Sequence, residues 1–590
     1  MNPDRPSPGV TPGEVGGWAA TRARWRAAVP LVCLLIATKV SAQDLAGTLA
    51  SCQGRVVSEV VVTARAPSLP NLPSQLRWVE RAVAGLHSTT DTSVVEAFLL
   101  LAEGETCTEE RRAESERVLR LQPFLADATV RAVPDGRGGS RIEVETLDEI
   151  SPELRVRFRG AQPSAVRLGS GNVAGRGLAL SASVERGFAY RPGLGFTATA
   201  YQVLGRPYVL SLVLDHRPLG GARSLSLAYP FFTDLQRSAW YVGYDEVDRY
   251  VPFARPTGED LSLQLQRRSW ALGGVRRMGI GRETAFVGAL VTHEDVDPAA
   301  YGVIISDSGL VADTTGALDG SMPSYRNVRL NAVFGARLLS FTQARGLDAL
   351  SATQDIATGV QLGALIGRGL PRFGSVAGDL FVSADLYAGL GTPRSLAALR
   401  ISAEGRRDQE IDRWDSMVGS GRLAWYVKPD EAHVLVSTLE VAGAWRSRIP
   451  FQLRLGDLQG GVRGYGRSRA GGAVRGVGRL EHRWLLGNVG EHAGIGVSSF
   501  VDVGRVWAGD ALIGVDSRLR MGAGLGLIVA VPPQSRRLWR LDLAVPLGSD
   551  PDARWQVRLS GLRTGPFWRE SDDIARVRAD ASPSTIFTWW

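Results

Sequence analysis

Residues 458–504 carry the pattern that decides the fold. They read LQGGVRGYGRSRAGG (458–472), AVRGVGRLEHRWLLG (473–487) and, after a short gap, HAGIGVSSFVDVG (492–504). The first stretch has six glycines in fifteen residues, which gives the backbone too much freedom for a helix. It therefore predicts a long loop with one ordered point, formed by Val462, Arg463, Gly464 and Tyr465.

The two stretches behind this loop alternate with a period of two. Residues 479–484 place charged side chains on one face and Leu480, His482 and Trp484 on the other, and residues 497–504 alternate in the same way. A period of two predicts strands with one apolar and one polar face. A soluble sandwich would turn the apolar face inward, whereas a membrane barrel turns it outward and keeps charge in a wet lumen.

A Val-Arg-Gly-Tyr loop tip, followed by a Glu-x-Arg strand and a Phe-x-Asp-x-Gly strand, resembles the BamA/TamA/FhaC superfamily of outer-membrane assembly and secretion barrels, also called the bacterial surface antigen family. The resemblance implies a transmembrane antiparallel β-barrel of sixteen strands, with the long loop folded back into the lumen. It also implies that Arg463 contacts Asp502, Glu481 or both, with Phe500 and Tyr465 nearby. The remaining motif positions are Arg483 and Gly504. The alternative is an ordinary loop between two strands of some other barrel.

Charge and composition bound the possible partners. The formal charge of +8 might indicate nucleic acid, but the arginines are spread along alternating segments rather than gathered in one patch. A charged lumen and loops that meet lipopolysaccharide explain them more simply, so no nucleic-acid partner is expected.

Arginines at 22–26, an apolar run at 27–38 and small residues before Gln43 predict a signal peptide over residues 1–42. We expect the mature chain in the bacterial outer membrane, with its N-terminal domain in the periplasm.

Residues 43–150 predict one small α/β domain. Strands are expected at 55–63, 128–133 and 141–146, helices at 76–86 and 108–120, and a further apolar segment at 94–101. This order resembles a POTRA (polypeptide-transport-associated) domain, and residues 114–124 are similar to its second helix and the following turn. Assembly members of the family usually carry several such domains, so a single one weakens the assembly role. Of the three cysteines, Cys33 lies in the expected signal peptide, and the two that remain in an oxidising compartment make a Cys52–Cys107 disulfide a hypothesis, with two separate buried residues as the alternative.

The barrel is expected over residues 151–562. Eighteen segments alternate as strands do, and the last five, from 473 to 562, are the clearest. Residues 293–325 predict a long, acidic, solvated loop without the spacing of an EF-hand calcium site. Residues 563–590 form either the final strand, which ends in aromatic residues, or a C-terminal tail, and we favour the tail.

The sequence contains no Gly-x-Ser-x-Gly elbow, no His-Glu-x-x-His and no phosphate-binding loop, so we expect no enzyme, no cofactor and no metal site. Three functions remain open. The first, which we prefer, is a barrel that inserts, assembles or translocates unfolded or nascent polypeptide clients, with a periplasmic chaperone or accessory protein as a further partner. The second is a passive channel or porin. The third is a barrel that handles lipid or lipopolysaccharide at the cell surface.

Overall fold

The computed structural model of the protein describes residues 52–67, 81, 85–159, 162–186, 192–279, 283–306, 309–375, 378–408, 412–456, 460–466, 468–548, 553–563 and 571–578. The expected signal peptide and most of the expected helix at 76–86 lie outside these residues. Across the described ranges, no helix is both long enough and apolar enough to cross a membrane.

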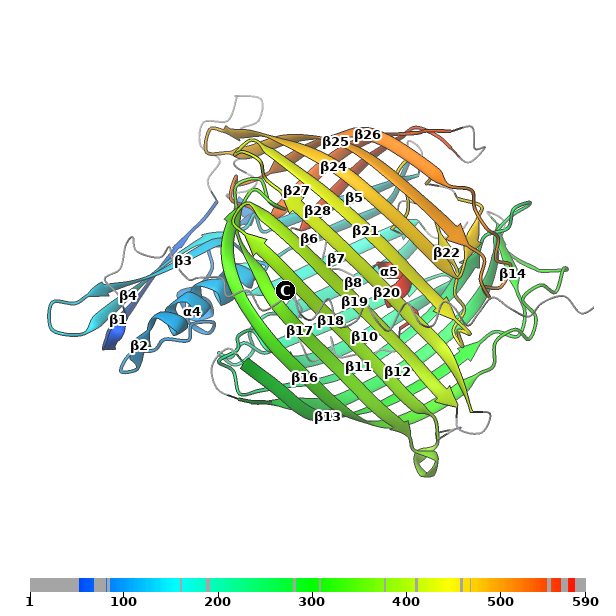
Figure 1. Ribbon diagram of the computed structural model, residues 1–590, viewed down its shortest axis with the longest axis horizontal. Helices are drawn as coiled ribbons and strands as arrows, with labels where there is room; N and C mark the ends of the chain where they lie inside the picture. Colours follow the sequence, from blue (N-terminus) through cyan, green and yellow to red (C-terminus); the bar gives the residue numbers. More distant parts are fainter. Residues whose placement is uncertain are drawn as a thin grey trace, which may run out of the picture. The chain divides into compact units, whose positions relative to one another are not determined.

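The N-terminal part is a small domain built on a four-stranded sheet. Its elements are, in chain order, β1 (Gln53–Arg65), α3 (Thr92–Glu96), β2 (Thr106–Thr108), α4 (Glu109–Leu121), β3 (Leu125–Pro134) and β4 (Ser140–Asp148). The sheet order is β2-β1-β4-β3, with β1 parallel to β4 and β3 antiparallel to it (Figure 1). The predicted strands and the helix at 108–120 correspond to β1, β3, β4 and α4. The three-residue strand β2 and the five-residue helix α3 are additions, and α3 overlaps the start of the apolar segment at 94–101.

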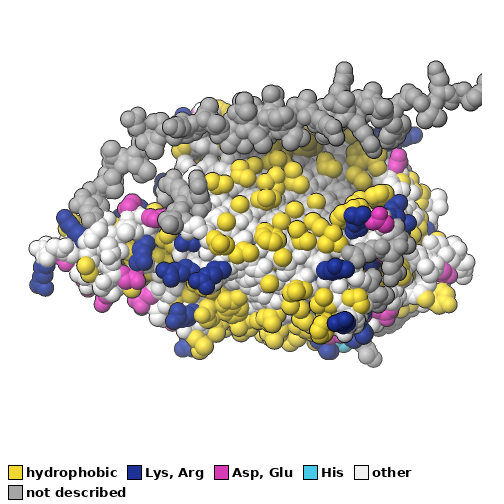
Figure 2. Space-filling model, turned by 60° about the horizontal axis from the view of Figure 1, so that its bottom comes forward, with side chains coloured by type: hydrophobic (Ala, Val, Ile, Leu, Met, Phe, Trp, Pro, Cys, Tyr) yellow, Lys and Arg dark blue, Asp and Glu magenta, His cyan; other side chains and the backbone are white. Residues whose placement is uncertain are grey.

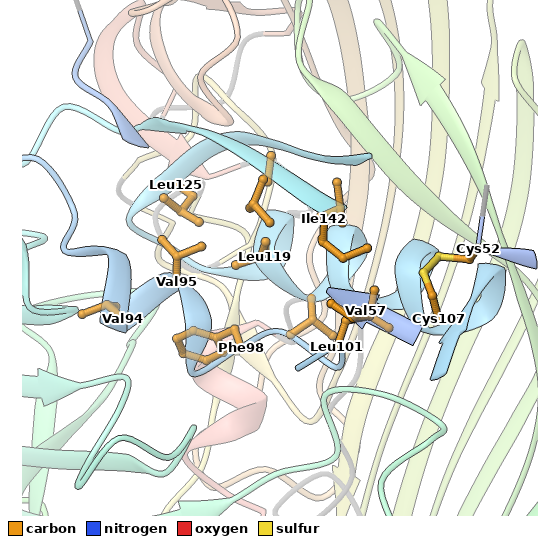
Figure 3. Packing of buried hydrophobic residues seen from close by; sticks show 14 of the residues in the cluster. Cys52, Val57, Val94, Val95, Phe98, Leu101, Cys107, Leu119, Leu125 and Ile142 are labelled. Carbon is orange, nitrogen blue, oxygen red and sulfur yellow. A yellow bond between two sulfur atoms is a disulfide. The ribbon is translucent and has the colours of Figure 1, made fainter. Parts of the chain in front are cut away.

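Helix α4 begins at Glu109 because Thr108 caps it. The hydroxyl of Thr108 accepts a hydrogen bond from the backbone N–H of Arg111 at 3.3 Å. This N–H is one of those in the first turn of a helix that have no partner within the helix. The inner face of α4 packs Leu119 into a core shared with the sheet, where Ile142 is fully buried (Figure 3). A disulfide joins Cys52 to Cys107 at the edge of this core.

The rest of the chain forms one antiparallel sheet that curls into a barrel, in which β28 lies next to β5 and β9 pairs with β10 (Figure 1). Its first strands are β5 (Pro152–Arg159), β6 (Gln162–Ser170), β7 (Leu178–Arg186), β8 (Pro192–Ala200), β9 (Val209–Arg217), β10 (Gly220–Tyr229), β11 (Ser238–Phe253), β12 (Leu261–Met278), β13 (Glu283–Pro298), β14 (Val303–Ser306), β15 (Gly309–Ala312) and β16 (Tyr325–Arg345). Those that follow are β17 (Thr353–Gly369), β18 (Leu380–Thr392), β19 (Ser395–Asp408), β20 (Arg413–Val427), β21 (His433–Trp445), β24 (Val474–Val489), β25 (Ala493–Trp507), β26 (Arg520–Ala530), β27 (Arg537–Pro546) and β28 (Gln556–Arg563).

The implied count of sixteen strands is wrong, because the described residues form a sheet of 22 strands. Two of these, β14 and β15, form a short hairpin between β13 and β16, which pair directly with each other, so twenty strands go around the barrel. Each of the eighteen predicted segments overlaps one of the twenty. The two that the sequence did not reveal are β5 and β6, whose pairing carries a register shift after Arg157 and includes Pro163, and such features obscure a period-two pattern.

The barrel inverts the usual distribution of side chains. On β27, Trp539, Leu541 and Leu543 are 43–46 % exposed, whereas the alternate residues Arg540 and Asp542 are at most 7 % exposed. Figure 2 shows hydrophobic side chains spread over one outer face of the barrel. The apolar face is therefore outside and the charged face inside, which confirms the barrel over the soluble sandwich.

Candidate functional site

The loop between β21 and β24, residues 446–473, contacts the inner wall of the barrel. Two-residue strands β22 (Leu453–Arg454) and β23 (Gly471–Gly472) pair at its base. Nearer the tip, the backbone N–H of Val462 donates to the carbonyl of Leu455 at 3.0 Å, and Gly464 has φ +92°, a conformation that favours glycine. Val462 and Tyr465 are almost fully buried. The tip is thus a folded turn with defined side-chain directions.

Arg463 makes the central contact of this tip. Its Nε and Nη2 atoms donate to the two carboxylate oxygens of Asp502 on β25, both at 2.7 Å. The backbone N–H of Arg463 donates to the same carboxylate at 3.2 Å, and its guanidinium lies 3.4 Å from the ring centroid of Phe500. The Asp502 side chain is fully buried and that of Arg463 is 9 % exposed. A bidentate, buried pair of this kind fixes both the position of the loop tip and the orientation of its arginine side chain.

Two glycines in the wall make room for the tip. A Cβ at Gly522 on β26 would lie 2.1 Å from the carbonyl oxygen of Arg463, and one at Gly504 on β25 would lie 2.7 Å from a methyl group of Val462. A side chain at Gly522 would therefore displace the loop backbone, and one at Gly504 would displace the buried side chain of Val462. Tyr465 adds an anchor, since its hydroxyl donates to the carbonyl of Met521 at 3.1 Å.

Glu481 lies in the same cluster but is not the main partner of Arg463. The closest approach of the two charged groups is 3.7 Å, while Glu481 accepts hydrogen bonds from Arg483 at 2.6 Å and from Arg540 at 2.8 Å. Asp542 lies 3.6 Å from Arg463 and accepts from Arg540 at 2.7 Å. The sequence placed Arg540 and Asp542 on the polar face of their strand but did not connect them to the loop, because side-chain faces do not reveal which strands meet around a ring.

A second charged cluster was missed entirely. Glu294 is 3 % exposed and accepts hydrogen bonds from Arg267 at 2.8 Å and from Arg406 at 2.6 Å. The sequence assigned residues 293–325 to a loop, but 293–298 belong to β13. The loop assignment is therefore wrong for residues 293–298. Glu294 continues the alternation of Leu290 and Thr292, and this period of two indicates a strand, although the acidic composition suggested a loop.

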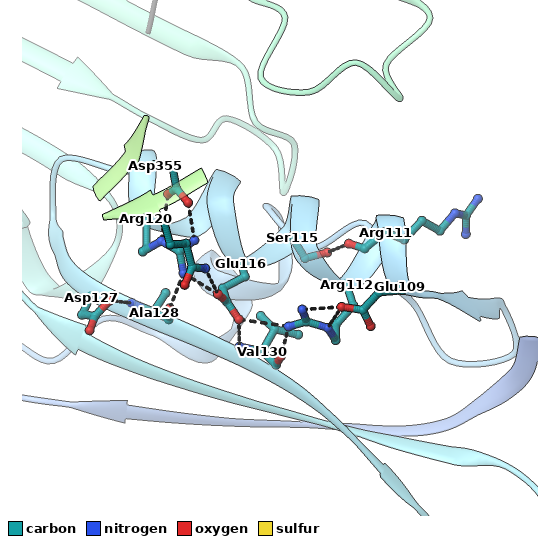
Figure 4. Close-up of polar contacts among 11 residues, drawn as sticks. Glu109, Arg111, Arg112, Ser115, Glu116, Arg120, Asp127, Ala128, Val130 and Asp355 are labelled. Carbon is teal, nitrogen blue, oxygen red and sulfur yellow. Dashed lines mark hydrogen bonds and ion pairs between the residues drawn. The ribbon is translucent and has the colours of Figure 1, made fainter. Parts of the chain in front are cut away.

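The N-terminal domain docks on the barrel through α4. Arg120 donates from Nε and Nη2 to the carboxylate of Asp355 on β17, at 2.9 and 2.6 Å (Figure 4). Glu116 accepts from Gln343 on β16 at 2.9 Å, and Arg536 donates to the carbonyl of Gln122 at 3.1 Å. Burial raises the pKa of Glu116, but the charge and hydrogen bond of Arg120, the backbone hydrogen bond of Val130 and the charge of Arg112 outweigh burial, so that this pKa lies below its ordinary value.

The same helix also covers the edge of the sheet. Strand β3 is an edge strand, and its backbone at Val130 is bonded by side chains in place of another strand (Figure 4). Val130 donates to Glu116 at 3.1 Å and accepts from Arg112 at 2.6 Å, and the carbonyl of Ala128 accepts from Arg120 at 3.1 Å. Side chains of α4 therefore satisfy an edge that would otherwise offer its donors and acceptors to another chain.

Within the described part of the chain, no group of three or more His, Cys, Asp or Glu residues is arranged to hold a metal ion.

Comparisons with known proteins give the following. No protein-family model matches the sequence, and no curated protein matches it. Among solved structures, the chain is similar to BamA from Haemophilus ducreyi lacking POTRA domains 1–3, with 12 % identity, a TM-score of 0.36 and coverage of 86 % of this chain and 84 % of that one. CdiB from Acinetobacter baumannii has 11 % identity and a TM-score of 0.36, and CdiB from Escherichia coli has 13 % and 0.35. Each of these two matches covers 92 % of this chain and 96 % of the CdiB chain. Likenesses of this size do not by themselves assign a function.

Proposed function

We propose that the chain is an outer-membrane β-barrel that inserts, assembles or translocates polypeptide clients, and that it receives them through its N-terminal domain in the periplasm. The observation that carries the proposal is the docked loop tip, in which Arg463 meets Asp502 and Phe500 in the arrangement that the sequence resemblance implies. The apolar outer face supports a membrane location, because exposed leucine and tryptophan on a ring of strands are stable in lipid and not in water. Outer-membrane lipid and lipopolysaccharide are then its surroundings.

The N-terminal domain suits an extended client through its sheet edge. A polypeptide strand can add to an exposed edge with backbone hydrogen bonds. In the resting state the edge of β3 is bonded to α4 at Val130, so strand addition requires Arg112 and Glu116 to leave it. Because Glu116 also bonds to the barrel residue Gln343, its displacement from β3 by a client would also disturb domain docking.

A passive channel is a weaker proposal, because loop 446–473 and residues 571–578 both contact the inner wall. A role in handling lipid or lipopolysaccharide has no separate observation in its favour. We further propose that the chain is not an enzyme and binds neither a cofactor nor nucleic acid, and that a periplasmic chaperone or accessory protein delivers the client.

The test is photo-crosslinking of the full-length chain in cells. A crosslinking amino acid replaces Arg131, which is exposed on the edge strand β3, and in the matched control replaces Glu59, which is exposed on β1 between two paired neighbours. We expect Arg131 to capture nascent barrels, periplasmic chaperones or one secreted protein, and Glu59 to capture much less. If neither position captures protein although the barrel is folded and abundant, the client role is refuted.

A further inference from the structure

A short segment near the C-terminus, residues 571–578, lies against the inner wall of the barrel. After β28 ends at Arg563, residues 571–578 reappear among inward-facing residues of strands that are far apart in the sheet order. This segment, Ser-Asp-Asp-Ile-Ala-Arg-Val-Arg, contains the short helix α5 (Asp572–Ala575). Of the C-terminal residues 563–590, the structure describes 563 and 571–578, so the choice between a tail and a final strand stays a prediction.

The two ends of the segment are held by ion pairs with different strands of the wall, β24 at one end and β18 and β19 at the other. Asp573 accepts from Arg475 on β24, with the shorter contact at 2.5 Å, and the Arg475 side chain is fully buried. Arg578 contacts Glu404 on β19 at 3.2 Å and Asp385 on β18 at 3.4 Å, and is itself 5 % exposed. Each charge of the segment that faces the wall therefore meets the opposite charge.

Between these pairs the segment is held by its backbone and by an apolar face. Arg267 on β12 donates to the carbonyl of Arg578 at 3.0 Å and to that of Arg576 at 3.5 Å, and its hydrogen bond to Glu294 helps to fix its position. Ile574 and Val577, three residues apart and so on one side of the turn, are 0 % and 6 % exposed. They pack against apolar residues of the wall and of the loop base, among them Leu265, Val296, Tyr325, Ala442, Ile449 and Phe451.

We propose that the inner wall carries a binding site for a short peptide, that residues 571–578 of the same chain are its resident ligand, and that their release opens the barrel. The site pairs an acidic residue with Arg475, takes two apolar side chains in the cluster around Leu265, and pairs a basic residue with Asp385 and Glu404. The inference rests on the proposed function only in that the barrel spans a membrane. It does not require a polypeptide client, because the flow of ions through the barrel is measured without one.

The first test is ion conductance of the full-length chain and its variants in planar lipid bilayers. Arg578→Glu turns a buried cation into an anion beside two carboxylates, which should expel the segment. Arg576→Glu is the matched control, since this arginine lies in the same segment but is exposed. We expect the full-length chain and Arg576→Glu to conduct weakly and Arg578→Glu to conduct severalfold more. Equal conductance of the two variants would overturn the proposal.

The second test separates a ligand from a merely structural filler. A chain that ends at Arg563 should conduct severalfold more than the full-length chain, and a chain that ends at Arg578 should not. The synthetic peptide 571–578, added to the chain that ends at Arg563, should restore the low conductance, whereas the same peptide with Arg578→Glu should not. Failure of the native peptide to block, or a truncated barrel no more conductive than the full-length one, refutes the site. Absence of crosslinked clients would refute the proposed function and leave both conductance tests standing.

Discussion

The strength with which the loop tip is docked can be worked out from the Arg463–Asp502 pair. Arg463→Gln removes a guanidinium that donates twice to a fully buried carboxylate, and leaves Asp502 with the backbone N–H of residue 463 as its loop contact. Breaking a buried pair from one side costs about 3–5 kcal/mol. Because the freed tip admits some water into the lumen, we take the lower figure, about 3 kcal/mol of docking free energy.

Hydrogen exchange of residues 460–466 measures that free energy directly. A loss of about 3 kcal/mol, at 1.4 kcal/mol per tenfold, speeds exchange through reversible opening of the loop by about 100-fold. The matched control is Arg505→Gln, on the same strand as Asp502. Arg505 pairs with Asp516 at 3.8 Å, and both side chains are roughly half exposed, so this substitution should cost less than about 1 kcal/mol. If exchange in Arg463→Gln rises no more than in Arg505→Gln, the ion pair does not hold the loop.

Three further outcomes are expected. Gly522→Ala places a Cβ 2.1 Å from a loop-tip carbonyl, so it should release the loop with every ion-pair partner intact, which exchange of 460–466 would report. The attachment of α4 to β3 should weaken as the pH falls through the lowered pKa of Glu116. The groups that lower this pKa belong to the N-terminal domain, and a depressed carboxyl pKa contributes stability that is present above its ordinary value of 4.5 and is lost as the pH falls through the lowered value. Exchange of α4 at pH 7 and at about pH 3 measures this, and Glu116→Gln should show a smaller decline. Cys52 and Cys107 should resist thiol labelling in the denatured, unreduced protein, and two reactive thiols would contradict the disulfide.

Much of the candidate site followed from local pattern. The alternation around Glu481 and Asp502 put both carboxylates on the polar faces of their strands, and the glycines around Arg463 indicated a loop with an ordered tip. These features depend on neighbours two residues apart, which a single sequence displays directly. The choice between Asp502 and Glu481 did not follow, because both acids occupy equivalent faces of adjacent strands.

The sequence by itself determined the class of the protein: period-two strands with apolar residues on one face, a small α/β domain before them, and the loop that carries Arg463. Only the tertiary structure decided how many strands surround the lumen and what lies within it. Glu294 joined Arg267 and Arg406, and Arg578 joined Asp385, across separations of 27 to 193 residues. Contacts of that range depend on ring closure and strand register, which set the meeting points of side chains but leave no trace in the local pattern along any one strand.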